Sequence, residues 1–118
     1  MRALILSDIH SNLEALQSVI ESAKSGGGFD QIWQLGDVVG YGPDPGGCID
    51  VIREHDAVGV AGNHDLAAIG RLSVEAFNMH AAMAALWTTE QLADEHVQYL
   101  GSLSLKVETE DFTLVHGS

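Results

Sequence analysis

The sequence predicts an α/β domain with a largely parallel sheet, and three observations lead to that prediction. Short apolar segments at residues 2–7, 31–35 and 57–61 have the length of buried strands. Segments with helical spacing of apolar residues separate them, as in successive βαβ units. Each strand-type segment is followed, directly or after one glycine, by Asp, Asn or His. A chain of 118 residues allows one modest core, so we expect a single domain over residues 1–118.

The first unit is a strand at residues 2–7 followed by a helix. The near-continuous apolar run of this strand indicates burial on both faces, as in a parallel sheet. Ser11 and Glu14 have the S-x-x-E spacing of a capping box. Behind them, five apolar residues recur at helical spacing and form one stripe: Leu13, Leu16, Val19, Ile20 and Ala23. The three glycines at 26–28 are expected to end the helix.

The second unit begins with the strand at 31–35 and continues through a turn rich in glycine and proline. Pro45 fits the first turn of another helix, because its missing N–H is not needed there. The strand at 57–61 comes next. Residues 66–101 are then mostly of helical type, and we interpret Met83 and Trp87 as packing residues on one face of a helix.

The C-terminal segment has the pattern of a β-hairpin. Apolar residues alternate with polar ones at Leu103, Leu105 and Val107, and the apolar run 112–115 supplies the return strand. Three of the six histidines lie inside helical sequence without companion ligands: His55, His80 and His96. We assign them solvated or capping roles.

Composition and charge exclude several classes of protein. The formal net charge is −12, from 17 acidic and 5 basic residues, and such a field repels duplex nucleic acid and anionic membrane surfaces. Cys48 is the one cysteine, which rules out a disulfide framework and favours a reducing compartment. We see neither a signal peptide nor an apolar run of membrane-spanning length, and we expect a cytoplasmic protein.

The polar residues that follow the strands form the candidate site. They are Asp8, His10, Asp37, Asn63, His64 and His116. In open α/β sheets, ligands bind outside the carboxyl ends of the strands, so these side chains are expected to meet. Two divalent ions about 3.5–4 Å apart need a bridging carboxylate between mixed oxygen and nitrogen ligands.

Asp37 is the candidate bridge between the two ions. Asp8 and His10 would complete one ion, and Asn63 and His116 the other. This mixture of ligands suits Mn, Fe, Zn, Ni or Co better than Ca. Such a pair clamps a phosphoryl oxygen and lowers the pKa of a bridging water to form hydroxide. His64 would then protonate the leaving oxygen.

Four sequence blocks resemble signature blocks of the calcineurin-like metallophosphoesterase family. They occur in the family's order: Asp8-Ile9-His10, Gly36-Asp37, Gly62-Asn63-His64-Asp65 and Val115-His116-Gly117. The resemblance is closest to small bacterial members with a Gly-Asp-x-Val-Gly-Tyr-Gly-Pro-Asp turn. It implies an α/β-β/α sandwich and a metallophosphoesterase that hydrolyses phosphomonoesters or phosphodiesters with two divalent ions, manganese first among them.

The resemblance also implies a role for each matching residue. Asp8, His10 and Asp37 would hold the first metal. Asp37, Asn63 and His116 would hold the second, and His64 would assist catalysis. This agrees with the assignment made from the strand ends.

Two departures from the family pattern matter. The fifth block, a Gly-His-x-His that gives one ligand to each metal, does not occur in these 118 residues. We therefore expect a partial sandwich that is truncated, or that is completed by an oligomer or a partner chain. Gly40 stands where the Ser/Thr phosphatases of the family carry Asp, and the Arg that follows there is missing too. The group that orients His64 is thus open, with Asp65 as the candidate.

Two other functions compete with a small-molecule phosphoesterase. One is a truncated fragment that binds metal without turnover, as the missing block suggests. The other is a nucleotide-binding or receiver-like domain without metal chemistry. That class needs a glycine-rich loop after the first strand, and residues 8–12 contain no glycine.

Overall fold

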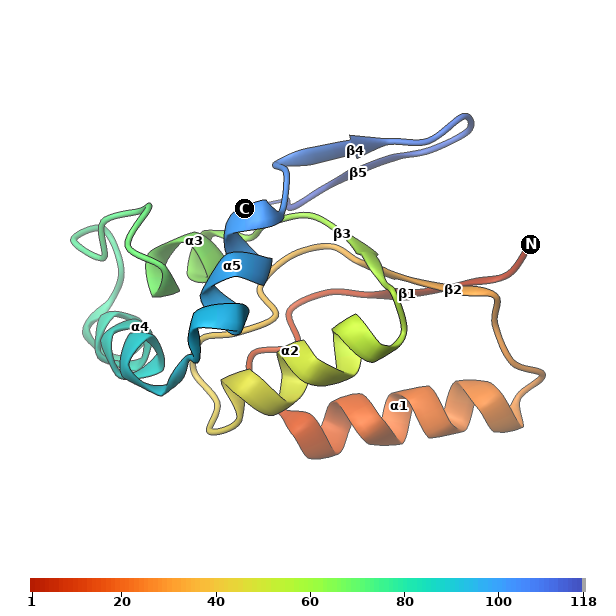
Figure 1. The fold of residues 1–118 in the computed structure, drawn as a ribbon, viewed down its shortest axis with the longest axis horizontal. Coiled ribbons are helices and arrows are strands. Elements are labelled where there is room, and N and C mark those ends of the chain that lie inside the picture. The colour runs from red at the N-terminus through yellow and green to blue at the C-terminus, as the bar shows by residue number, and fades with distance from the viewer. Residues whose placement is uncertain (118) are drawn as a thin grey trace.

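The computed structural model describes residues 1–117 and confirms the α/β prediction. Ser118, the last residue of the predicted domain, lies outside the described residues. Within residues 1–117, five helices and five strands follow one another (Figure 1). In order they are β1 (Ala3–Leu6), α1 (Leu13–Ser25), β2 (Gln31–Gln34), α2 (Pro45–Glu54), β3 (Val58–Gly59), α3 (Asn63–Ala68), α4 (Met79–Gln91), α5 (Asp94–Ser102), β4 (Lys106–Glu108) and β5 (Thr113–Val115).

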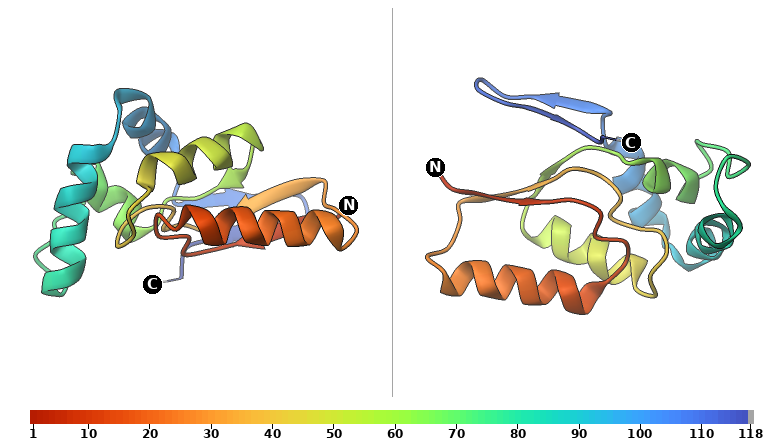
Figure 2. Two further views of the ribbon diagram at one scale, coloured as in Figure 1. Left: turned by 90° about the horizontal axis from the view of Figure 1, so that it is seen from below. Right: turned by 180° about the vertical axis from the view of Figure 1, so that it is seen from behind.

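The first three strands form a parallel sheet in the order β1-β2-β3, and β4 pairs with β5 as the predicted antiparallel hairpin. Helices α1 and α2 cover one face of the sheet, and the hairpin lies over the other (Figures 1 and 2). A parallel bridge between Val60 and Ser104 joins the end of β3 to the segment that leads into the hairpin. This bridge ties the segment before the hairpin to the three-stranded sheet.

Alternation along β2 places side chains in two apolar clusters on opposite faces of the sheet. Ile32 belongs to the larger cluster, between the sheet and the helices, where Ile49 and Ile52 of α2 are fully buried. Trp33 belongs to the smaller cluster beneath the hairpin, together with Val60 and Leu114. The main core therefore lies on the helical side.

The helix starts are set by polar side chains and by proline. Asn12 is the N-cap of α1, where its side chain accepts a 3.1 Å hydrogen bond from the Ala15 N–H. The predicted capping box of Ser11 and Glu14 is wrong, because Ser11 has a left-handed φ of 58° and is fully buried before the helix begins. Pro45 occupies the first turn of α2, as predicted.

Two predictions about burial are wrong. Ile5 of β1 is 57% exposed, so the first strand is not buried on both faces. β1 lies at one edge of the sheet and pairs with β2. Met83 and Trp87 of α4 are 62% and 41% exposed. The buried face of α4 carries small residues instead, which allow the helix to pack closely: Ala81, Ala85 and Thr88.

Several smaller predictions can be compared with the structure. The capping roles are confirmed for His55, the C-cap of α2, and for His96, whose Nδ1 accepts from the Ala93 N–H at the start of α5. Residues 71–78, expected as part of a mostly helical region, form turns and bends. Within residues 1–117, no helix combines the length and the apolar character needed to cross a lipid bilayer.

Candidate metal centre

The loops that follow β1 and β2 run side by side and hold the candidate ligands against one another. The Asp8 N–H donates to Gly36 O at 3.0 Å, and the His10 N–H donates to Asp37 O at 2.9 Å. The Ser11 N–H continues this ladder with a 2.9 Å bond to Val38 O. Backbone pairing therefore extends beyond the sheet and brings Asp8 and His10 beside Asp37.

These loops also contain most of the strained backbone. Six non-glycine residues among residues 1–117 have a positive φ, and five of them lie here: Asp8, His10, Ser11, Asp37 and Tyr41, with φ between 49° and 59°. A non-glycine residue in this region is disfavoured by about 1–3 kcal/mol, and such residues gather at functional sites. The strained backbone therefore indicates that these loops have a functional role.

Asp37 lies at the centre of the cluster of predicted ligands. Its Oδ2 is 3.3 Å from His116 Nε2 and 3.7 Å from His10 Nε2. Asp8 Oδ1 is 3.4 Å from His10 Nε2, and Asn63 Oδ1 is 3.1 Å from His116 Nε2. One ligand atom each from Asp8, Asp37 and His116 fall within 4.8 Å of one another. The structure thus brings all five predicted ligand residues together.

The hydrogen bonds of the two histidine rings direct their lone pairs into this cluster. The Nδ1 atom of His10 lies 3.0 Å from Val39 O, and that of His116 lies 2.8 Å from Leu35 O. A carbonyl oxygen only accepts, so each Nδ1 carries the proton and donates it. In the neutral form of each ring, Nε2 then carries a lone pair that faces carboxylate and amide oxygens. Acceptors that face acceptors repel, and a bound cation removes the repulsion, so the donor set fits a divalent metal.

Asp8 and Asp37 differ in their surroundings. The side chain of Asp8 is 54% exposed, whereas that of Asp37 is 4% exposed. The Ser7 hydroxyl donates a 2.6 Å hydrogen bond to Asp8, and this bond is the main cause that lowers the pKa of the Asp8 carboxyl. Asp8 is therefore ionised at neutral pH and can hold a cation at the open side of the cluster.

The Asp65 carboxylate binds backbone N–H groups of the neighbouring loops and makes no hydrogen bond to the His64 ring among the described residues. Asp65 is fully buried, and its carboxylate accepts from the N–H groups of Asp37 at 2.8 Å, Val39 at 3.1 Å and Gly62 at 2.9 Å. Burial raises the pKa of this carboxyl to about 6, while the three backbone bonds act in the opposite direction. Asp65 thus joins the loop after β2 to the start of α3.

His64 lies beside the cluster in an apolar setting. Its backbone N–H donates a 3.0 Å bond to Asp37 Oδ1, and its ring centroid is 4.9 Å from that of His10. Its Nδ1 is buried without a hydrogen-bond partner among the described residues, and a Cβ on Gly40 would lie only 2.7 Å from that atom. Burial is the main cause that lowers the pKa of His64. Packing therefore orients this ring.

Two aromatic residues at the site were not singled out from the sequence. The ring centroids of Tyr41 and Phe77 are 4.9 Å and 4.8 Å from that of His64. Tyr41 stands between two glycines in the turn after β2, which could have drawn attention to it. Phe77 lies in the irregular segment before α4, and no sequence pattern connects it with the site.

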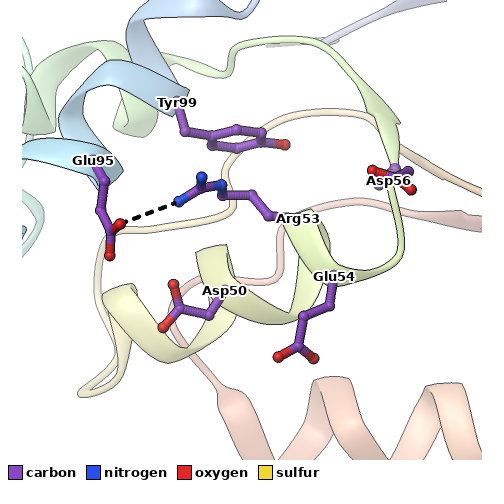
Figure 3. A pocket seen from close by; sticks show the side chains of 7 residues that line it. Asp50, Arg53, Glu54, Asp56, Glu95 and Tyr99 are labelled. Carbon is purple, nitrogen blue, oxygen red and sulfur yellow. Dashed lines mark ion pairs between the residues drawn. The ribbon is translucent and has the colours of Figure 1, made fainter.

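A second group of possible ligands lies between α2 and α5, and two of its three members line a hollow of about 720 Å³ (Figure 3). It consists of Asp50, Glu95 and His96. His96 Nδ1 accepts from the Ala93 N–H, so its Nε2 carries the proton and donates it to Asp50 Oδ1 at 2.9 Å. Both ring nitrogens are thus engaged. The Arg53 guanidinium lies 3.9 Å from the Glu95 carboxylate, from Nη1 to Oε2. We therefore interpret the group as polar contacts that join α2 to α5.

Comparison with known proteins shows the family to which the chain belongs. The calcineurin-like phosphoesterase family model matches residues 1–118. The crystal structure of a metallophosphoesterase from Sphaerobacter thermophilus superposes with a TM-score of 0.83 at 51% identity, covering 100% of this chain and 47% of that one. The uncharacterized protein MJ0912 of Methanocaldococcus jannaschii is 43% identical over 104 residues, which are 88% of this chain and 42% of that protein.

A more distant relative has a named activity. A symmetrical bis(5'-nucleosyl)-tetraphosphatase of Erwinia tasmaniensis is 37% identical over 71 residues, covering 56% of this chain and 25% of that protein. The chain spans less than half the length of each of these relatives. The family assignment does not depend on this shorter match, because the family model covers the whole sequence. The chain belongs to the calcineurin-like phosphoesterase family, which is a family of hydrolases.

Proposed function

We propose that the protein is a metal-dependent phosphoesterase with a dinuclear metal centre at the carboxyl ends of its parallel strands. The observation that carries the proposal is the position of Asp37 Oδ2, which lies 3.3 Å and 3.7 Å from two imidazole Nε2 atoms. The Nδ1 atom of each ring lies beside a backbone carbonyl, so Nε2 is the atom through which each neutral imidazole would bind a metal. One carboxylate between two such rings is the arrangement that a shared bridging ligand requires.

Each residue of the cluster has a part in this proposal. Asp8, His10 and Asp37 hold one divalent ion, and Asp37, Asn63 and His116 hold the other. When bound, the pair of ions supplies Lewis acidity at the phosphoryl oxygens and a water of lowered pKa. The mixed oxygen and nitrogen ligands favour manganese, with Fe, Zn, Ni or Co as other possible occupants.

His64 is proposed to serve the leaving group. In hydrolysis the bond between phosphorus and the ester oxygen breaks, and that oxygen needs a proton. The Nδ1 atom of His64 is buried beside Gly40, so Nε2 is the ring atom available to the substrate. Asp65 acts indirectly, since its carboxylate fixes the backbone of Asp37. The backbone N–H of His64 in turn orients the Asp37 carboxylate.

The proposed partner is a small phosphate ester, a monoester or a diester. The net charge of −12 opposes duplex nucleic acid and anionic membranes, and bound divalent cations reverse the sign locally for an anionic ester. The single cysteine fits a reducing compartment, and a cytoplasmic location is part of the proposal.

Hydrolysis assays test the proposal. We expect Mn²⁺-stimulated hydrolysis of p-nitrophenyl phosphate or bis(p-nitrophenyl) phosphate, and its loss in Asp37→Ala. Asp111→Asn, an exposed change in the hairpin turn, is the matched control and should retain activity. Activity that survives Asp37→Ala would contradict the proposal. Calorimetry that shows metal binding without turnover would instead favour a metal-binding module.

A further inference from the structure

Tyr41 is a half-exposed aromatic residue at the rim of the candidate metal centre. Its ring centroid is 5.0 Å from that of His10, with the two planes nearly perpendicular at 81°. It is also 4.9 Å from the ring of His64, at an interplanar angle of 37°. Half of the residue's surface is nevertheless exposed. Tyr41 therefore borders the site and offers a free aromatic surface there.

The backbone holds Tyr41 in this position with little freedom. The Gly42 N–H donates to His10 O at 3.2 Å, and the Asp44 N–H donates to Ser11 O at 3.0 Å. A Cβ on Gly42 would overlap the His10 carbonyl oxygen, so the two loops are in direct contact. Tyr41 itself has a φ of 57°, which is strained for a tyrosine. A strained residue that leaves half of its surface in water is better explained by ligand binding than by packing.

Phe77 extends the aromatic border of the site. Its ring centroid is 4.8 Å from that of His64, at an interplanar angle of 33°. His64 thus contacts both aromatic rings and is the residue proposed to meet the leaving oxygen. A group attached to that oxygen would then lie beside Tyr41 or Phe77, and Tyr41 is the more exposed of the two.

We propose that Tyr41 selects phosphate esters whose leaving group carries an aromatic ring, which stacks on its exposed surface. The inference rests on the proposed phosphoester hydrolysis at the same centre. Stacked rings attract one another at centroid separations of about 4.5–7 Å, and stacking of a base on an aromatic side chain improves binding on the order of tenfold or more. Such stacking requires no positive charge, which suits a chain with a net charge of −12. An aryl group and a nucleobase both have this chemistry.

A matched pair of substrates isolates the aromatic ring. Adenosine 5'-monophosphate and ribose 5-phosphate have the same primary ester oxygen and differ in the base. In the Mn²⁺-loaded protein, we expect kcat/KM to be about tenfold higher or more for the nucleotide. Tyr41→Phe keeps the ring and should keep this ratio. Tyr41→Asn removes the ring with a residue that tolerates a positive φ, and should bring the ratio near one.

Further experiments distinguish aryl esters from nucleotides as the substrates and include a control variant. Selective loss of phenyl phosphate hydrolysis in Tyr41→Asn, with the nucleotide ratio unchanged, would assign the surface to aryl esters. Trp87→Gln removes a similarly exposed ring from α4 and should change neither measurement. An equal fall for all esters in Tyr41→Asn would overturn the proposal, since it would show that Tyr41 only positions His64. A wild-type protein with no preference for aromatic esters would overturn it too.

Binding without turnover separates this inference from the proposed function. In saturation-transfer NMR, adenosine should bind to the wild type and to Tyr41→Phe more strongly than ribose does, and Tyr41→Asn should lose the difference. Wild-type protein that hydrolyses no ester would contradict the proposed function, and the adenosine experiment would then decide the inference alone. Equal signals from wild type and Tyr41→Asn for adenosine and for phenol alike would overturn it.

Discussion

The backbone N–H of Asp37 donates a 2.8 Å hydrogen bond to the fully buried carboxylate of Asp65, 28 residues further along the chain. A second hydrogen bond joins the same two segments in the opposite direction: Asp37 Oδ1 accepts a 3.0 Å bond from the backbone N–H of His64. The loop after β2 and the first turn of α3 therefore hold each other. This mutual support fixes the carboxylate that the proposal places between two metal ions.

Asp65→Asn should destabilise the protein because it replaces one acceptor oxygen with an amide donor. That NH₂ group would face a backbone N–H that now donates to the carboxylate, and charge-assisted bonds would be lost. We expect the free energy of unfolding to fall by about 3 kcal/mol, measured by denaturant titration without metal. Asp111→Asn makes the same chemical change at an exposed site and should alter stability by less than about 0.5 kcal/mol. Equal stability of the two variants would refute the role given to Asp65.

Gly42→Ala should disturb the metal site through the backbone alone. A methyl group at position 42 would overlap the carbonyl oxygen of His10, so the loops after β1 and β2 would have to separate. We expect weaker Mn²⁺ binding by at least tenfold, together with lower thermal stability. Gly28→Ala is the comparison: it has open space around the new methyl group and a positive φ of 78°, and should lose only about 1 kcal/mol of stability. Unchanged Mn²⁺ affinity in Gly42→Ala would contradict the close contact of the loops.

Cys48 should resist thiol reagents in the folded protein. It is fully buried, and burial, followed by the charges of Asp44 and Glu14, raises the pKa of its thiol to about 12 from an ordinary value of 9.0. The folded state therefore keeps the proton when the unfolded state loses it, and the associated stability is lost as the pH rises above 9. At pH 8.5, labelling by iodoacetamide should be slow in buffer and fast in guanidinium chloride. Rapid labelling of the native protein would show that the interior around Cys48 is open.

Metal binding should raise the thermal stability, since the ligand atoms come together only in the fold. Saturation of one site at 100 times its dissociation constant adds about 2.7 kcal/mol to the free energy of unfolding. His116→Ala removes one imidazole and should reduce the shift that Mn²⁺ produces, and a chelator should reverse the shift in the wild type. His80→Ala changes an exposed histidine on α4 and should leave the shift intact. Equal shifts in the two variants would place the metal elsewhere.

The positions of the five candidate ligands could be anticipated from the sequence for a simple geometric reason. Parallel strands end at the same edge of a sheet, so residues in the loops that follow β1, β2 and β3 are brought near one another. Asp8 and Asp37 come together in this way, and Asn63 meets them through His116. His116 joins them because the segment before the hairpin pairs with the end of β3. Apolar periodicity identified the strands themselves.

Other features depended on information that periodicity does not contain. Whether α4 turns its large or its small residues inward is decided by how closely its neighbours approach, so the exposure of Met83 could not be inferred. The role of Asp65 follows from the directions of three backbone N–H groups in distant loops. Phe77 reaches His64 through an irregular segment whose path no local pattern encodes.

The central claim is that Asp37 lies between two metal ions, and electron paramagnetic resonance of the Mn²⁺-loaded protein tests it most directly. We predict the signal of two exchange-coupled Mn²⁺ ions in the wild type and in Asp111→Asn, and its loss in Asp37→Asn. A signal from isolated ions alone in the wild type, or a coupled signal that survives Asp37→Asn, would contradict the account.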